Sequence, residues 1–256
     1  MVYKTILLIV LSITVNAQIM LNPNRSGTLA PTGGGGGGYT TDQLTLAWIH
    51  TDHAAGLVDT LYDQIDNYPM SMVVAGERLN NTDSGMVFVN GDENMYHTDY
   101  PNLLDSAVTI EFVGKVDTTF TDTDQVLFGQ RSAGLILFNI GINTEGYFGA
   151  SYYNTKWGTN DGRKQNYVGA HGWHHFVATY DGGSTVVMYI DGVVATDLND
   201  NLHQIVAQAR IQIGYGEGVN PAPGTIFKYG AFYKKVLTQE EVTNNYNSAT
   251  IQDLLP

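Results

Sequence analysis

The chain has 256 residues; 43% are hydrophobic, only 14% are charged, and 29 are glycine. A typical soluble domain is about one quarter charged and about 7% glycine, so this composition favours short strands and tight turns over long helices. The net charge of −13 argues against nucleic acid, which requires clustered lysine and arginine, and against anionic lipids. The absence of cysteine excludes disulfides, thiolate metal sites and a cysteine nucleophile.

Residues 1–17 have the pattern of a secretory signal peptide. Lys4 precedes an apolar run at 6–15, which is too short to span a bilayer, and Ala17 is the small residue that signal peptidase requires before a mature Gln18. The ending resembles signal peptides of Bacteroidota, which predicts a secreted or cell-surface bacterial protein whose mature chain does not insert into the membrane. A buried first strand or a short anchor helix is the alternative for this segment.

Residues 18–42 are expected to form a flexible tether. Two prolines and six consecutive glycines at 33–38 cannot offset the ordering entropy of a packed structure. The segment is either a spacer that holds a module away from an anchor or an ordinary disordered N-terminal tail. The folded domain is expected at 43–256.

Strands dominate the pattern of this domain, because apolar residues recur at every second position. The candidate strands cover 44–49, 86–89, 108–116, 135–142, 147–153, 173–180, 185–190, 210–215 and 226–235. In 108–116 the apolar residues alternate with polar ones such as Glu111, which predicts a half-buried strand. Asp191 and Gly192 predict a type I′ turn, whose central residues both need positive φ. This series of short strands and turns predicts an all-β sandwich or jelly roll.

One short helix is predicted near the C-terminus. Thr238 and Glu241 have the spacing of a capping box, and Leu237 and Val242 have the spacing of a hydrophobic staple. The helix is too short to be stable alone, so it is expected to dock on the sheet.

Three blocks of sequence carry a family resemblance. They are GWHHFVATYDGG at 172–183 with VMYIDGV at 187–193, SGMVFVNGDENMY at 84–96, and FKYGAFYKKVLTQEE at 227–241. They resemble the WHHVAxTYDG…LYVDG hairpin, the ALxFDGxDDYV strand and the LSxEEI helix of the laminin-G-like, concanavalin A-like family. The resemblance implies a concanavalin A-like (LamG-type) β-sandwich jelly roll with one short C-terminal helix, and it implies that Trp173 lies in the core.

Catalysis is not expected from these residues. Glycoside hydrolases on this fold place two carboxylates on one strand face, as in Glu-x-Asp-x-Glu, and this chain has no such strand; Glu111 is alone on its strand. The Arg-x-x-x-Arg strand of alginate-lyase-like relatives is also missing. His174 and His175 are adjacent on a strand, so they should point to opposite faces and should not bind one metal ion. The chain is therefore predicted not to be an enzyme.

Aromatic and amide residues near two turns are the candidates for ligand binding, because flat rings contact sugar C–H groups and amides bind hydroxyls. These residues are Tyr152, Tyr153, Asn154, Trp157, Asn160, Asp161, Tyr96 and Tyr100. The alternative is that Tyr152 or Tyr153 is core and that Trp157 fills a loop. Hard oxygen ligands that could hold Ca²⁺ occur at Asp92, Asn94, Asp122 and Asp124, although such residues also satisfy turn backbones.

The sequence thus predicts a non-catalytic, secreted or surface-displayed, lectin-like module that binds a glycan or polysaccharide. A structural or adhesive subunit of a cell-surface or virion appendage, with other appendage proteins as partners, is the alternative. An extracellular polysaccharide hydrolase or lyase is the third possibility.

Overall fold

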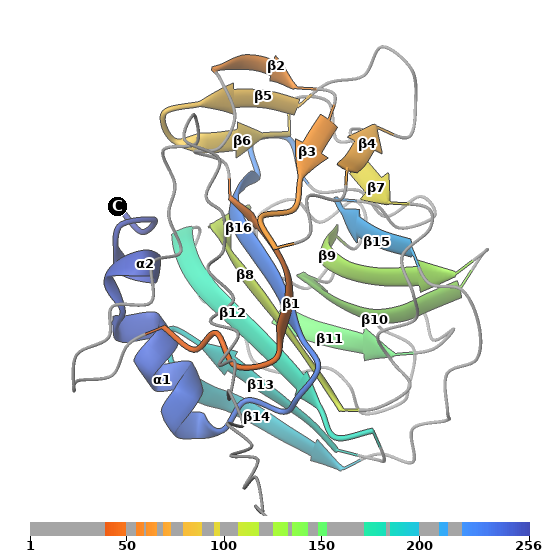
Figure 1. The fold of residues 1–256 in the computed structure, drawn as a ribbon, viewed down its shortest axis with the longest axis vertical. Helices are drawn as coiled ribbons and strands as arrows, with labels where there is room; N and C mark the ends of the chain where they lie inside the picture. Colours follow the sequence, from red (N-terminus) through yellow and green to blue (C-terminus); the bar gives the residue numbers. More distant parts are fainter. Residues whose placement is uncertain are drawn as a thin grey trace, which may run out of the picture.

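Two antiparallel sheets make up most of the described chain in a computed structural model of the protein (Figure 1). The structure describes residues 39–49, 55–58, 60–65, 69–72, 79–88, 95–97, 107–117, 125–132, 135–142, 148–152, 172–182, 185–199, 210–214 and 222–256.

The larger sheet has nine strands, all paired antiparallel. Its spatial order is β14 (Val193–Asn199), β13 (Thr185–Ile190), β12 (Gly172–Tyr180), β8 (Val108–Val116), β16 (Ile226–Tyr233), β6 (Gly85–Val87), β5 (Leu79–Thr82) and β2 (Gly56–Val58), with β1 (Leu44–Ile49) also paired to β16.

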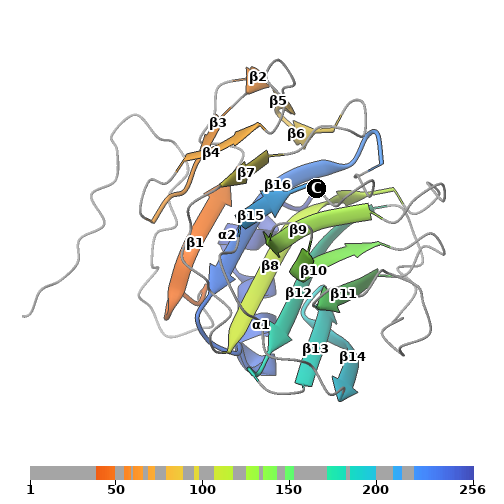
Figure 2. The ribbon, with the colours of Figure 1, turned by 90° about the vertical axis from the view of Figure 1, so that its right-hand side faces the viewer.

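The smaller sheet has seven strands, also all antiparallel. Its order is β11 (Phe148–Tyr152), β10 (Leu135–Ile142), β9 (Gln125–Ser132), β15 (Arg210–Ile213), β7 (Met95–His97), β4 (Pro69–Met72) and β3 (Thr60–Tyr62). In Figure 2 this sheet faces the viewer and the helices lie behind the larger sheet.

The main core fills the space between the two sheets. Apolar residues at every second strand position meet there, and aromatic rings connect the layers. Phe148 of β11 lies 4.6 Å from Phe176 of β12, and Phe128 of β9 lies 4.9 Å from Phe232 of β16, measured between ring centroids. Both sheets are therefore tied together by buried aromatic pairs.

A second core lies on the other face of the nine-stranded sheet, under α1 (Gln239–Asn247) and α2 (Ala249–Gln252). The predicted capping box is confirmed, and the staple residues Leu237 and Val242 are both fully buried. The sequence predicts one helix; α2 adds a single turn, which starts where the Ser248 side chain accepts a hydrogen bond from the backbone of Ile251.

Strand β8 is buried on both faces, so the prediction of a half-buried strand is wrong. The reason is the C-terminal helices: Val108, Ile110 and Phe112 face the other sheet, while Glu111 and Val113 lie beneath the second core. Period-two alternation cannot distinguish solvent from a helix as the neighbour of the polar face.

Trp173 does not lie in the core, so this prediction is also wrong. Its ring is half-buried near the C-terminal end of α2, and Lys228 Nζ lies 4.3 Å from the ring centroid. The same ammonium donates to the carbonyl oxygen of Leu254 at 2.7 Å. Trp173 therefore supports a cation–π contact at the edge of the second core.

The turn between β13 and β14 confirms the type I′ prediction, because Asp191 has φ 51° and Gly192 has φ 77°. A Cβ at Gly192 would lie 3.1 Å from Tyr246 of α1. Gln239 Nε2 and Thr243 Oγ1 both donate to the carbonyl oxygen of Gly192. The helix therefore holds this hairpin turn directly.

We expect Gly192→Ala to reduce the free energy of unfolding by about 1 to 3 kcal/mol, because alanine is strained at positive φ, and by a further amount for the contact with Tyr246. Gly224→Ala is the matched control, since Gly224 has φ 87° and a Cβ added there would meet no atom within 4 Å. Urea denaturation measures the free energy of unfolding of both variants. Equal losses would show that the Tyr246 contact adds nothing.

Candidate functional site

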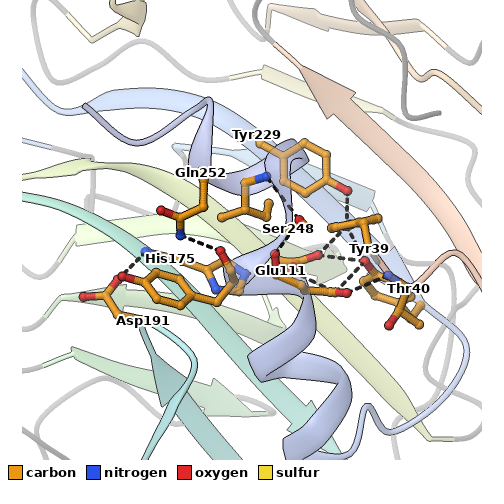
Figure 3. Close-up of polar contacts among 12 residues, drawn as sticks. Tyr39, Thr40, Glu111, His175, Asp191, Tyr229, Ser248 and Gln252 are labelled. Atoms are coloured by element: carbon orange, nitrogen blue, oxygen red, sulfur yellow. Dashed lines mark hydrogen bonds and ion pairs between the residues drawn. The ribbon is translucent and has the colours of Figure 1, made fainter. Parts of the chain in front are cut away.

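A fully buried carboxylate lies at the centre of the second core (Figure 3). Glu111 comes from the middle of β8, and its side chain points toward α1 rather than toward the other sheet. His175, from the neighbouring strand β12, places its Nε2 2.6 Å from Glu111 Oε1, and neither side chain is exposed to solvent. An uncompensated carboxylate at this depth would be costly, so its other contacts matter.

Three further side chains hydrogen-bond to the same carboxylate. Tyr39 donates its hydroxyl at 2.5 Å and Tyr233 at 2.7 Å, both to Oε2, and Asn245 Nδ2 of α1 donates to Oε1 at 3.2 Å. The Tyr39 hydroxyl also contacts those of Tyr229 and Tyr233. We call Glu111, His175, Tyr39, Tyr229, Tyr233 and Asn245 the Glu111 cluster.

The cluster determines the ionisation of its members. Burial by itself raises the pKa of Glu111, but the hydrogen bond and charge of His175, together with the two tyrosine donors, outweigh burial and leave this pKa below its usual value. Burial and then the negative charge of Glu111 raise the pKa of Tyr39 and of Tyr233 well above the usual value. The carboxylate is thus ionised and the phenols are neutral donors at neutral pH.

A second carboxylate anchors the neighbouring turn. Asp191 Oδ2 lies 2.9 Å from His174 Nδ1, and Asp191 Oδ1 accepts from the backbone N–H of His175 at 2.9 Å. Burial raises the pKa of Asp191, but these hydrogen bonds outweigh it and the net pKa is lowered. His174 and His175 thus have separate carboxylate partners, and the prediction that they point to opposite faces is confirmed: His174 contacts Phe176 of the main core.

The Glu111 cluster also receives contacts from residues that precede the first strand. Tyr39 reaches Glu111, the backbone N–H of Thr40 donates to Asn245 Oδ1 at 2.6 Å, and Asp42 forms an ion pair with Lys235. The end of the predicted 18–42 tether therefore packs on the domain, because the Tyr39 hydroxyl donates a hydrogen bond to Glu111. Residues 1–38 lie outside the described part of the chain.

These contacts make the Glu111 cluster a structural anchor rather than a binding site. Its carboxylate oxygens accept hydrogen bonds from the N-terminal segment, β16 and α1 and contact His175 of β12, and the Glu111 side chain has no exposed surface. It joins three parts of the chain that are far apart in sequence.

We expect Glu111→Gln to reduce the free energy of unfolding by about 1 to 3 kcal/mol at neutral pH, because the buried carboxylate accepts hydrogen bonds at both oxygens and an amide would leave one of these donors without an acceptor. Since the folded-state pKa of Glu111 is lowered, this stabilisation is present above the unfolded value of about 4.3 and disappears as the pH falls through the folded value. Denaturation from pH 7 to pH 3 should therefore show a smaller difference between the two proteins in acid.

Glu240→Gln is the control, because it makes the same substitution at an exposed position on the first turn of α1. A Glu111→Gln protein as stable as this control would contradict the anchoring role.

The outer face of the seven-stranded sheet presents a different surface. One row of registered residues crosses all seven strands on the face opposite the main core. In order from β11 to β3 it contains Ser151, Asn139, Gly129, Gln212, Tyr96, Ser71 and Thr60. We call this the polar row; six strand spacings give it a length of roughly 29 Å.

Alternation along the strands establishes which face carries the row. Phe138 and Ile140 flank Asn139, and Ile211 and Ile213 flank Gln212, and all four flanking residues belong to the main core. Because successive residues of a strand point to opposite faces, Asn139 and Gln212 belong to the outer face.

Two amides of the polar row have unused hydrogen-bonding capacity. Asn139 is 0% exposed and Gln212 is 1% exposed, yet Asn139 Nδ2, Asn139 Oδ1 and Gln212 Nε2 have no partner in the described structure. A Cβ at Gly129 would lie 1.9 Å from Asn139 Oδ1, so the missing side chain of Gly129 makes room for this amide. Buried polar atoms without partners are rare and costly, which makes these two amides candidates for contact with a polar ligand.

The predicted ligand residues map only partly onto this surface. Tyr96 lies in β7 within the polar row, and Tyr152 ends β11 in register with core residue Phe138, at the far edge of the sheet from β7. The strand positions of Tyr96 and Tyr152 are therefore separated by β15, β9 and β10. The other predicted residues lie outside the described part of the chain; they are Tyr153, Asn154, Trp157, Asn160, Asp161 and Tyr100.

Sequence reasoning missed Asn139 and Gln212. A usable signal was present, since each is a lone amide within an otherwise apolar stretch of its strand: Leu135–Ile142 reads LILFNIGI and Arg210–Ile213 reads RIQI.

The four residues of the calcium prediction all lie outside the described residues, so calcium binding stays a prediction. They are Asp92, Asn94, Asp122 and Asp124. Among the residues that are described, no three histidine, cysteine or acidic side chains gather as a metal site would require. Within the same residues, no helix has the length and apolar character needed to cross a membrane.

The fold defines an antiparallel β-sandwich with two helices on one outer face, and comparison with known proteins identifies its family. The family model of the concanavalin A-like lectin/glucanases superfamily matches residues 82–243. The chain belongs to this superfamily. A search of curated proteins finds no match.

Solved structures share the fold at low sequence identity. A Trypanosoma rangeli sialidase with the inhibitor DANA superposes with a TM-score of 0.62 at 16% identity, covering 84% of this chain and 34% of the sialidase. The binding domain of botulinum neurotoxin DC in complex with SialylT gives 0.57 at 13% identity, covering 80% of this chain and 51% of that one. The chain thus spans about a third of the sialidase and half of the neurotoxin chain.

Proposed function

We propose that the chain is a non-catalytic, secreted or surface-displayed module that binds a glycan through the polar row. The observation that carries the proposal is the pair of buried amides, Asn139 and Gln212, which have donors and acceptors without a partner in the described structure. A sugar hydroxyl both donates and accepts, as these amides do. Leaving such a group unsatisfied costs about 1 to 3 kcal/mol, so a ligand that supplies the missing hydrogen bonds removes this cost.

Similar structures support a glycan as the ligand class. One is the Trypanosoma rangeli sialidase with sialic acid bound, at 16% identity, and another is the neurotoxin binding domain with SialylT. At this identity the likeness concerns the fold, so the polar row itself carries the argument for this chain.

The distribution of carboxylates supports a non-catalytic role. A retaining glycosidase needs two carboxyl groups about 5 Å apart at the sugar. None of the seven strands of the smaller sheet contains Asp or Glu. Glu111 lies in the other sheet, where its carboxylate oxygens are hydrogen-bonded within the Glu111 cluster.

We expect Asn139→Ala and Gln212→Ala each to weaken glycan binding by about 1 to 3 kcal/mol, because each removes amide groups that the ligand would satisfy. Isothermal titration against the best ligand of a glycan array measures the change. Melting temperatures should stay equal or rise, since alanine removes a buried group that has no partner in the described structure. Asn247→Ala is the control, because Asn247 is exposed on α1, across the other sheet.

Two outcomes would contradict the proposal. Unchanged binding in both variants would move the site away from the polar row. New reducing ends or unsaturated products from a bound polysaccharide would show that the chain is an enzyme.

Secretion through a cleaved signal peptide is part of the proposal. We expect the mature protein to begin at Gln18, and we expect Ala17→Arg to block cleavage, because signal peptidase accepts only small side chains at that position. Intact-mass measurement of the exported protein tests this prediction. Gln18→Asn is the control, because it keeps Ala17 and should still be cleaved. A mature mass that includes Met1 would contradict it.

A further inference from the structure

A buried lysine lies on the outer face of the larger sheet, outside the Glu111 cluster. Lys228 of β16 is 8% exposed. Its Nζ donates to the carbonyl oxygen of Leu254 at 2.7 Å and lies 4.3 Å from the centroid of the Trp173 ring. The chain has 25 acidic residues, yet no carboxylate among the described residues forms an ion pair with Lys228. Lys228 is therefore a buried cation without a counter-ion in the described structure.

This cation also has hydrogen-bonding capacity to spare. A lysine ammonium carries three N–H donors. One of them donates to Leu254, and the indole ring of Trp173 attracts the positive charge through its π-face. Within the described structure, at least one N–H of Lys228 is left without an acceptor. Burial that no opposite charge offsets lowers the pKa of Lys228, which is the direction expected when the charged form lacks partners.

A β-bulge directs Lys228 to this position. Phe227 and Tyr229 are paired with consecutive residues of β8, so Lys228 between them is the extra residue of β16. Phe227 belongs to the main core and Tyr229 to the second core. A Cβ at Gly85 of β6 would lie 2.9 Å from Lys228 Cγ, so the missing side chain of Gly85 makes room for the lysine stem. Bulges re-aim side chains and are over-represented beside active sites, so this one marks Lys228 as a candidate functional residue.

A second, exposed lysine shares this face. Lys115 of β8 lies directly opposite Trp173 of β12 in the antiparallel register. Residues opposed in this way have Cβ atoms about 4.5 to 5.5 Å apart on one face of the sheet. Lys115 is two residues from Val113, which belongs to the second core, so Lys115 and Trp173 lie on the outer face. No described carboxylate forms an ion pair with Lys115 either. Because Lys115 is exposed and Trp173 is half-buried, a ligand can approach from solvent.

We propose that Lys228 and Lys115, with the Trp173 ring beside them, bind an oxyanion, which is a carboxylate or sulfate group of a ligand. Its negative oxygens accept from the unused N–H of Lys228 and from the Lys115 ammonium, and its charge supplies the counter-ion that Lys228 lacks. A lysine ammonium is a point charge without the planar fork that matches arginine to a carboxylate, so the shared chemistry is the negative oxygen. The site goes beyond the proposed function, since it lies on the opposite sheet from the polar row.

Titration of the full chain with inorganic sulfate tests the site. The readout is the indole N–H signal of Trp173 in an NMR spectrum; the chain has three tryptophans, so the signal is assigned by its loss in Trp173→Phe. Chloride keeps the ionic strength constant, because a change in general screening would itself alter charge interactions. We expect the signal to shift and to saturate. A parallel titration with acetate is the carboxylate arm, and the anion that saturates the signal at the lower concentration identifies the preferred group.

Variants assign the effect to the two lysines. Lys228→Met keeps an apolar stem and removes the ammonium, and Lys115→Gln removes the exposed charge. We expect each to raise the dissociation constant for the better anion by about tenfold or more, the scale of one hydrogen bond to a charged group. Lys234→Gln is the matched control, because it removes one positive charge at an exposed position after β16.

Melting temperatures give a second readout that does not depend on the Trp173 signal. An anion that binds the folded protein raises the melting temperature. Sulfate also stabilises proteins generally, because it is excluded from their surface, so the comparison is between variants. We expect sulfate to raise the melting temperature of Lys115→Gln by less than that of Lys234→Gln. Lys115 is exposed, so this comparison holds even if Lys228→Met does not fold.

Two outcomes would overturn the site. A Trp173 signal that moves in proportion to the concentration of both anions, without saturating, would show that no site exists. Equal dissociation constants in the unchanged protein, Lys228→Met and Lys115→Gln would place the anion elsewhere. Neither outcome bears on the polar row, because the row lies on the other sheet.

Discussion

The burial of Glu111 in the central strand is the constraint on which the rest of the structure depends. A carboxylate with no access to water is tolerated only when its oxygens are fully hydrogen-bonded. The partners come from His175 on the next strand, Tyr39 before the first strand and Asn245 on the C-terminal helix. The two ends of the described chain are therefore drawn onto the same face of the larger sheet.

This arrangement gives the two outer faces of the sandwich opposite roles. On the larger sheet, helices and the N-terminal segment cover the outer face, the Glu111 carboxylate is hydrogen-bonded within the protein, and Lys235 pairs with Glu241. On the smaller sheet, the polar row contains two buried amides without partners in the described structure, Asn139 and Gln212. The first face stabilises the fold, and the second is the one that we propose binds a glycan.

The main core explains how the smaller sheet can carry such unfavourable features. Aromatic pairs such as Phe128 with Phe232 join the two sheets from within, so the strands of the smaller sheet are held by their inner residues. Destabilising amides are accepted where the remaining structure is stable enough to hold them in place, and such sites are commonly functional.

Local patterns in the sequence determined much of the fold. Alternation located β1 at Leu44–Ile49 and β13 at Thr185–Ile190, and the residues of the 191–192 turn and of the helix cap specified their own geometry, because these features depend on neighbours within a few positions. The three-residue strands β2 and β3 were missed, since so short a run carries no clear period. The longer strands β9 and β14 were missed as well.

Only the tertiary structure decided what the polar residues do. Alternation predicted that Glu111 lies on the polar face of its strand, but it could not show that a helix far along the chain would cover that face. It also gave no reason to place Asn139 and Gln212 on either side of Gly129. The cause is physical: residues from β10, β9 and β15 become neighbours through strand order, which non-local pairing establishes. The sequence determined the elements and the family; the pairing of distant strands determined the candidate site.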